Sequence, residues 1–113
     1  MTERRGSEAQ GEWPGVTDLD PALGHRSRLG ICVLLAGAER MTFRLLQDRL
    51  DESDGGLGAH LKRLEEERYV TAAKKFVDRK PVTWYALSAR GRTALRRHLE
   101  ALERLLKATN NLT

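Results

Sequence analysis

The sequence predicts a mainly α-helical domain that carries one small antiparallel β-hairpin. Four segments place apolar residues three or four positions apart, which is the spacing of one buried helix face. Residues that favour the start of a helix precede several of these segments. Between the third and fourth segments, β-branched and aromatic residues flank a polar turn, as in a hairpin. A chain of 113 residues is long enough for about one such domain.

The composition predicts a well-charged cytoplasmic protein. Charged residues make up 32% of the chain, and the net charge is +4. The isoelectric point of about 9.6 is typical of nucleic-acid-binding domains, although small basic proteins also bind acidic partners. The single cysteine, Cys32, has no partner for an internal disulfide, and the longest apolar run, residues 31–36, is too short to span a membrane. No apolar segment follows the charged N-terminus, so we expect no secretory signal and no membrane association.

The ordered domain is expected to span residues 18–107, between a polar tail over 1–17 and a short tail over 108–113. Asp20 followed by Pro21 is typical of a helix start, because the aspartate caps the first turn and proline suits the first helical position.

After a break near Gly24, the first long helix is expected to end at Gly37 and to bury Ile31, Leu34 and Leu35. Cys32 lies within the same apolar run. The sequence offers no second cysteine and no neighbouring basic cluster, so we interpret Cys32 as a small core residue rather than a redox or metal-binding thiol.

Two shorter helices are predicted next, joined by a tight turn. Thr42 is a good N-cap for the first, and Met41 and Leu46 occupy the positions of a hydrophobic staple. Ser53 caps the second, and its buried stripe consists of leucines at i, i+4 and i+7, which are Leu57, Leu61 and Leu64. Two helices joined in this way form a helix-turn-helix unit.

A basic β-hairpin is predicted directly after this unit. Strands over residues 69–77 and 82–87 flank a turn over residues 78–81. Alternation places Trp84 and Tyr85 on opposite faces, so only one of these aromatics can face the core of its own domain. A charged hairpin beside a helix-turn-helix is the arrangement of a winged helix.

The last helix is expected over about residues 88–107, capped by Ser88. Leucines recur along it at the 4-3-4 spacing of a coiled-coil seam, and a second apolar strip of Ala94, Ala101 and Leu105 lies beside the seam. One strip can pack on the domain while the other meets a second subunit. We therefore predict a C-terminal dimerisation helix, with burial of the whole helix in its own domain as the alternative. The predicted dimerisation residues are Leu95, Leu99, Leu102, Leu105 and Leu106.

The second helix of the helix-turn-helix is the candidate recognition helix. Its glycines would let the backbone approach a phosphate closely, and Lys62 and Arg63 are its cationic candidates. The alternative for these two cations is an ordinary solvated helix face, paired with the acids that follow. The candidate DNA-binding residues on this helix are Ser53, Gly55, Gly56, Gly58, Ala59, His60, Lys62 and Arg63.

The hairpin is the second candidate DNA-binding element. It carries four cations against one acid, Asp78, and such a turn can contact phosphates or insert Arg79 into a narrow minor groove. The alternative is a solvated hairpin whose lysines only prevent edge-to-edge aggregation. Its candidate DNA-binding residues are Lys74, Lys75, Arg79, Lys80 and Thr83.

The sequence offers little support for an enzyme. The three histidines, His25, His60 and His98, are scattered, and neither a nucleophile–base pair nor a metal-ligand spacing is apparent. We therefore expect no catalytic residues, no metal site and no cofactor.

Together these segments resemble winged-helix transcriptional regulators of the MarR/ArsR-like group, closest to the short single-domain members. The resemblance covers residues 19–106. Its matching stretches are RLGICVLLAGAERMTFRLLQDRL, LGAHLKRLEEERYV and RKPVTWYALSARGRTAL, which combine a helix-turn-helix, a basic wing and a capped final helix.

The resemblance implies a homodimer that binds a pseudo-palindromic operator in double-stranded DNA, with half-sites about one helical turn, roughly 34 Å, apart. Members of the group commonly repress transcription and release DNA on binding a small-molecule effector. Such effectors usually bind between the terminal helix and the domain.

The chain departs from the group's usual pattern in two places. Gly56 and Gly58 stand where the group usually has hydrogen-bonding residues, and Arg68 stands where it usually has glycine. A positive φ at Arg68 would cost about 1 kcal/mol. The bare helix start, together with the acidic run over residues 65–67, leaves an alternative function open, that of a winged-helix protein-interaction module without operator binding.

Overall fold

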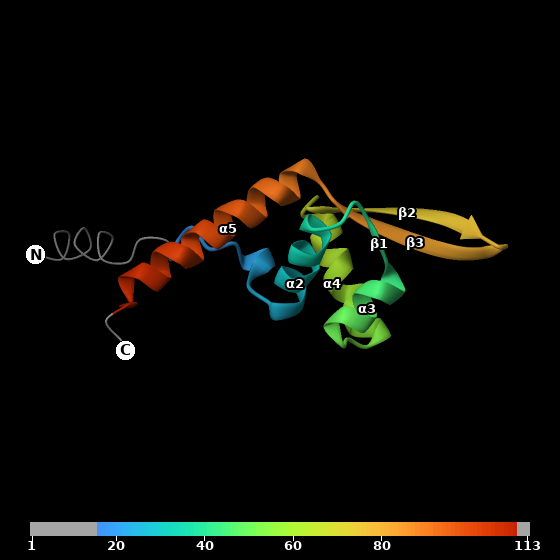
Figure 1. Ribbon diagram of the computed structural model, residues 1–113, viewed down its shortest axis with the longest axis horizontal. Helices are drawn as coiled ribbons and strands as arrows, with labels where there is room; N and C mark the ends of the chain where they lie inside the picture. Colours follow the sequence, from blue (N-terminus) through green and yellow to red (C-terminus); the bar gives the residue numbers. More distant parts are fainter. Residues whose placement is uncertain (1–15, 111–113) are drawn as a thin grey trace, which may run out of the picture.

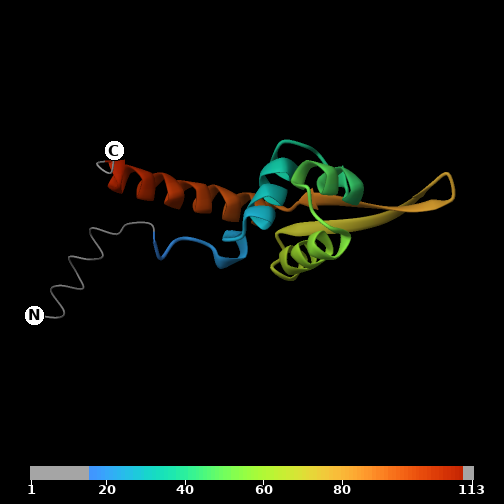
Figure 2. The same cartoon turned by 90° about the horizontal axis from the view of Figure 1, so that it is seen from below.

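The computed structural model describes residues 16–110. Three helices pack together in the middle of the molecule, the β-hairpin projects from one side, and the last helix extends from the other (Figures 1 and 2). The elements in chain order are η1 (Pro21–Leu23), α2 (Arg26–Ala36), β1 (Met41–Thr42), α3 (Phe43–Leu50), α4 (Asp54–Glu66), β2 (Val70–Val77), β3 (Lys80–Leu87) and α5 (Ala89–Ala108). This is a winged helix fold, as the sequence predicted. The predicted tail over residues 1–17 lies almost wholly outside the described residues.

Side-chain caps begin most of the helices at the predicted positions. Thr42 Oγ1 accepts a hydrogen bond from the amide of Leu45, Ser53 Oγ from that of Gly56, and Ser88 Oγ from that of Gly91. Each cap provides an acceptor for an amide that has no partner within its own helix. These short-range contacts confirm the predicted helix starts.

The first helical region begins as expected but is split in two. Asp20 caps the short 3-10 helix η1, with Pro21 at its first position. The chain then breaks at Gly24, and α2 begins with a cap that was not predicted, in which His25 Nδ1 accepts from the amide of Ser27 at 3.0 Å. Gly37 follows the end of α2, as expected.

The sheet has one strand more than the predicted hairpin. Its order is β1-β3-β2, and the two residues of β1 pair with Trp84 and Tyr85 of β3. The predicted turn over residues 78–81 was too long, because only Asp78 and Arg79 form it, with φ angles of 52° and 69°. A two-residue turn with both φ angles positive matches the twist of the strands, so Lys80 and Pro81 belong to β3. We call the hairpin formed by β2 and β3 the wing.

The two aromatics of β3 separate as alternation requires. Tyr85 is buried in the core with Val70 and Leu87, which are at the base of the wing. Trp84 faces the other way, and the guanidinium of Arg40 lies over its ring at 4.2 Å from the centroid. This cation–π contact covers part of the face of Trp84 that the core leaves open.

The helix-turn-helix surrounds a compact leucine core. Leu46 of α3 and the predicted α4 stripe of Leu57, Leu61 and Leu64 are fully buried against α2. The turn between α3 and α4 places Asp51 in the left-handed region, at φ 54°. Cys32 is also buried in this core, and burial first and nearby Asp20 second raise the pKa of its thiol to about 12. The interpretation of Cys32 as a core residue is therefore supported.

The first half of α5 packs on the domain and anchors it. Leu95 and Ala101 are buried, and buried His98 accepts a hydrogen bond at Nδ1 from the amide of Asp20 at 3.0 Å. The carboxylate of Asp20 in turn accepts from the hydroxyl of Tyr69. Leu95 belongs to the core of its own domain, so its predicted place in a dimer seam needs correction. Within residues 16–110, no helix is long and apolar enough to cross a membrane.

Candidate nucleic-acid interface

The outward face of α4 is short and bears few side chains. Gly55, Ala59 and Lys62 are exposed, as the leucine spacing predicted. A Cβ atom added at Gly55 or Gly58 would meet no other atom within 4 Å, so the backbone at both positions faces open space. A phosphate can therefore approach the first turns of this helix closely, where the partial positive charge of the helix lies.

Gly56 has a different surrounding from the other two glycines of α4. A Cβ atom there would lie 2.6 Å from Oε1 of Glu52 and 3.0 Å from the capping oxygen of Ser53. Gly56 therefore makes room for the Glu52 side chain at the start of the helix. Its predicted role on the DNA surface now has a competing structural reason.

His60 is turned toward α2 and into a polar cluster, instead of toward the open face of α4. Nη1 of Arg28 lies 3.3 Å from its Nδ1, and its ring centroid lies 4.2 Å from that of His25. An arginine can only donate, so Nδ1 of His60 accepts, and Nε2 carries the proton toward Glu52, whose Oε2 lies 3.7 Å away. Glu52 also accepts from the hydroxyl of buried Ser27. These contacts occupy the ring of His60 within its own chain.

The charges of this cluster act on one another. Burial, and then nearby His25, lowers the pKa of His60, although nearby Glu52 opposes that shift. The hydrogen bond from Ser27 is the main cause of the lowered pKa of Glu52. The cluster therefore favours neutral His60 beside ionised Glu52, and it ties the start of α2 to α4.

Arg63 and the acids beyond it form a partly paired surface. Nε of Arg63 lies 3.4 Å from Oε2 of Glu67, one helical turn further on, and the Arg63 side chain is about half exposed. Exposed pairs of this kind are worth about 0.3–0.5 kcal/mol, so the guanidinium can exchange this partner for a stronger one. Both interpretations of Arg63, as a solvated ion pair and as a DNA contact, fit this geometry.

The wing presents its cations to solvent along its whole length. Every residue from 71 to 81 is exposed, and this stretch includes all four predicted cations, Lys74, Lys75, Arg79 and Lys80. Thr83 lies nearer the base and is half-buried. The hairpin extends well beyond the helices on the side opposite α5 (Figures 1 and 2).

A groove lies between the wing and the helix-turn-helix. Two of its residues, Arg44 and Gln47, were not predicted from the sequence. Arg44 and Gln47 of α3 line this groove, opposite Pro81 and Thr83 of β3, and Asp54 at the start of α4 closes it. The side-chain amide of Gln47 donates to the carboxylate of Asp54. Arg44 and Gln47 are three residues apart after the Thr42 cap, so helical spacing could have placed them on one face.

The predicted dimerisation residues divide into two sets. Leu99, Leu102 and Leu106 of α5 are 43%, 37% and 70% exposed, whereas Leu105 is half-buried and Leu95 is buried. The exposed three leave an apolar strip along α5.

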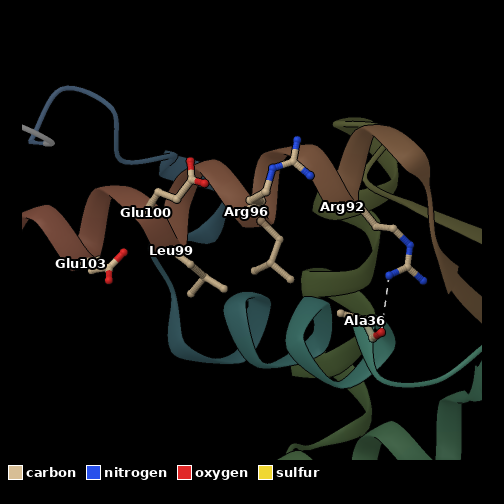
Figure 3. Close-up of a pocket in the computed structure, with 7 residues that line it drawn as sticks. Ala36, Arg92, Arg96, Leu99, Glu100 and Glu103 are labelled. Carbon is tan, nitrogen blue, oxygen red and sulfur yellow. Dashed lines mark hydrogen bonds between the residues drawn. The ribbon is translucent and has the colours of Figure 1, made fainter.

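A second groove lies between α5 and the end of α2. It is lined by Ala36, Arg92, Leu95, Arg96, Leu99, Glu100 and Glu103. Figure 3 shows Leu99 pointing from α5 toward α2, while Arg96 and Glu100 point away side by side. Nη1 of Arg92 donates to the carbonyl oxygen of Ala36 at 3.4 Å, which closes one end of the groove.

A helix-turn-helix followed by an exposed basic hairpin defines a class of DNA-binding domain. A family model described as a winged helix DNA-binding domain matches residues 27–106, and the chain belongs to this family. Members of the family are DNA-binding proteins of the transcription-regulator type and do not form an enzyme class.

The chain is also similar to one sequence relative and to solved structures. The chain is 32% identical over 80 residues to the uncharacterized protein MJ0432 of Methanocaldococcus jannaschii, covering 71% of this chain and 87% of the relative. A transcriptional regulator homologue from Pyrococcus horikoshii superposes with a TM-score of 0.72 at 30% identity, covering 76% of this chain and 85% of that one. A cysteine variant of Lactococcus lactis ZitR, solved in complex with DNA, gives a TM-score of 0.56 at 22% identity, covering 77% of this chain and 58% of that one. At that identity the last likeness concerns the fold alone, which is that of MarR-like regulators.

Proposed function

We propose that this protein is a homodimeric transcriptional repressor that binds a pseudo-palindromic operator through α4 and the wing. The observation that carries the proposal is the exposed wing, with four cations against one acid, beside a helix start whose backbone is open to a phosphate. Cations in such a position neutralise phosphates, and the neutralised phosphates release condensed counterions. Lys62 and Arg63 of α4 supply the contacts to base edges, and Arg44 and Gln47 add contacts along the groove between α3 and the wing.

Fluorescence anisotropy on a duplex from upstream of the protein's own coding region tests DNA binding. Log affinity should fall with log salt concentration by about 0.9 per neutralised phosphate. Replacing Arg79 and Lys80 together with alanine should weaken binding to all sequences and reduce the slope by about 1.8. Arg97→Ala is the matched control, because it removes an exposed cation from α5, far from the wing. Absence of binding by the wild-type protein at low salt would refute the proposal.

Base readout by α4 is tested separately. Arg63→Ala should reduce the preference for the operator over unrelated DNA, whereas Lys80→Ala should weaken both alike. If Arg63→Ala and Lys80→Ala both weaken all sequences equally, α4 contributes no base contacts, and recognition rests on phosphates and DNA shape.

Dimerisation is proposed through the strip of Leu99, Leu102 and Leu106, since these leucines are exposed and lie three and four residues apart on one face of α5. Pairing two such strips removes apolar surface from water, which is worth about 25 cal/mol per Å². Light scattering should give twice the chain mass for the wild type and a single chain mass for a Leu99→Glu, Leu106→Glu variant. Leu45→Glu is the control, because it also replaces an exposed leucine with glutamate, on α3. Footprinting on both operator strands should then show half-sites roughly 34 Å apart.

The proposed effector site is the groove between α2 and α5 (Figure 3). Arg92 offers a guanidinium group at one end of the groove, and Leu95 and Leu99 offer an apolar wall, which together suit a small carboxylic acid with an apolar body; Glu100 and Glu103 also line the groove and restrict the acid to the end that Arg92 closes. A panel of such acids should displace the protein from its operator, and Arg92→Ala should abolish the displacement without changing operator affinity. If no acid displaces the protein, the effector part of the proposal fails while operator binding stands.

The alternative is a protein-interaction module, which the bare start of α4 and the acids at its end favour. A pull-down that yields one stoichiometric protein partner, together with no footprint on DNA, would establish it. A clean footprint would exclude it.

A further inference from the structure

The tip of the wing carries an exposed pair of apolar residues, and the packing of the domain does not explain why these residues are apolar. Phe76 is 72% exposed, and its direct partner across the hairpin is Pro81. In a hairpin with a two-residue turn, the pair next to the turn is hydrogen-bonded and the following pair is not. Phe76 and Pro81 form this second pair, so their side chains are close together, and the missing amide of Pro81 costs no ladder hydrogen bond.

One member of this pair, Pro81, borders the proposed DNA groove. Paired residues share a face, and every second pair along the hairpin lies on the same face. From base to tip one face therefore carries Val70 with Leu87, Ala72 with Tyr85, Lys74 with Thr83, and Phe76 with Pro81. Pro81 and Thr83 of this face line the groove shared with α3 and the start of α4, together with Val82 between them. Along this face toward the tip, the pair of Lys74 and Thr83 is followed by the pair of Phe76 and Pro81, and then by the turn that contains Arg79.

We propose that Phe76 and Pro81 form an apolar wedge that enters the minor groove of DNA and packs against deoxyribose and the edge of a base step. Apolar side chains of minor-groove-binding proteins contact DNA in this way, and several partly unstack a step and kink the duplex. The proposal rests on the proposed function, because it places the wedge on the DNA that α4 and the wing bind.

The charges around the pair favour DNA over another apolar partner. Lys74 shares its face, Arg79 is in the adjacent turn, Lys75 and Lys80 lie on the opposite face of the same narrow hairpin, and Asp78 is the only acid of the hairpin. A partner of this tip must therefore be highly negatively charged and must offer a narrow apolar cleft that admits the tip of a hairpin. The minor groove of DNA meets both requirements. A second copy of the chain is disfavoured, because the proposed dimer strip on α5 lies at the opposite end of the molecule (Figures 1 and 2).

Salt titrations of DNA affinity separate an apolar contact from an electrostatic one. Phe76→Ala should lower affinity about tenfold at every salt concentration and leave the slope of log affinity against log salt unchanged. Lys80→Ala should reduce the slope by about 0.9. Val77→Ala is the matched control, because Val77 is the neighbouring exposed apolar residue, 47% exposed, and its pairing with Lys80 puts it on the opposite face. Its affinity should stay close to that of the wild type, and Phe76→Leu should retain most of the wild-type affinity.

The readout for the wedge itself is the fluorescence of 2-aminopurine placed at successive steps flanking the footprint. The wild type should raise the fluorescence at one step in each half-site, and Phe76→Ala should not. Equal affinity of Phe76→Ala and wild type at all salt concentrations overturns the wedge while leaving the proposed function intact. A reduced slope for Phe76→Ala also overturns it, because the residue would then act through the cations. If the wild type binds no DNA at low salt, the proposed function itself fails.

Discussion

Replacing Gly91 with alanine should destabilise the fold strongly, although alanine favours helices. Gly91 lies in the first turn of α5, where the helix crosses the start of β2. A Cβ atom there would lie 2.2 Å from the carbonyl oxygen of Tyr69 and 2.7 Å from Cδ1 of Leu87. The leucine side chain can rotate away, but the carbonyl oxygen cannot move freely, because it accepts from the amide of Ser88 at 2.9 Å and from its hydroxyl at 3.1 Å.

The magnitude follows from these contacts. Overpacking of a buried site costs about 1–3 kcal/mol, and each hydrogen bond to the Tyr69 carbonyl that is lost adds about 1 kcal/mol. The helix propensity of alanine returns at most about 1 kcal/mol. We therefore expect the free energy of unfolding to fall by about 2–4 kcal/mol, and Tm by at least about 10 °C for a domain of this size.

Urea unfolding followed by circular dichroism measures this change, and Gly58→Ala is the matched control. Gly58 lies inside α4 with nothing within 4 Å of its missing Cβ, so the same substitution there should stabilise the fold by up to about 1 kcal/mol. Opposite signs at the two glycines would support the contact geometry. If Gly91→Ala unfolds within about 0.5 kcal/mol of the wild type, the packing of α5 on β2 described above is wrong.

Further predictions concern backbone strain, pH and thiol chemistry. Arg68 has a φ of 63°, so Arg68→Gly should raise the free energy of unfolding by about 1 kcal/mol in urea titrations. The pKa of His60 lies below its ordinary 6.5, first because of burial and then because of His25, so the folded chain holds this proton less tightly than the unfolded chain. The free energy of unfolding should therefore be fully retained above about pH 6.5 and fall as the pH drops below it, and less so in His60→Gln. Because burial raises the pKa of the Cys32 thiol to about 12, an aromatic disulfide reagent should react with it only as fast as the domain unfolds; fast reaction in the native state would contradict this.

The features that the sequence predicted best are set by neighbouring residues. The caps at Thr42, Ser53 and Ser88 depend on an acceptor and an amide two or three positions apart, and all three are present. The leucine stripe of α4 depends only on helical period, and it is buried as expected. The sequence marked Arg68 as standing where glycine is usual without fixing its backbone angle, and the structure gives it a φ of 63°.

The features that the sequence left open depend on contacts between distant segments. The strand β1 is only two residues long and exists because β3 is beside it, which no local pattern indicates. The same holds for Ser27 with Glu52, which are 25 residues apart, and for Asp20 with His98, which are 78 apart. These tertiary hydrogen bonds also determine which polar residues are available to a ligand. Helical spacing placed His60 at the margin of the exposed face, and the contacts with α2 then turned its ring inward.

At the glycines of α4, the stability of the fold and DNA binding favour different residues. A side chain at Gly56 would meet the carboxylate of Glu52, which would have to move and give up its present position beside Ser27. Packing explains neither Gly55 nor Gly58, which face open space, and two alanines would favour the helix. If close approach of a phosphate is the reason for Gly55, Gly55→Ala should leave the fold at least as stable and yet weaken DNA binding, without changing the salt slope, because no charge is lost. A variant that is equally stable and binds DNA equally well would show that the bare helix start makes no backbone contact with DNA, and the wing would then carry most of the affinity.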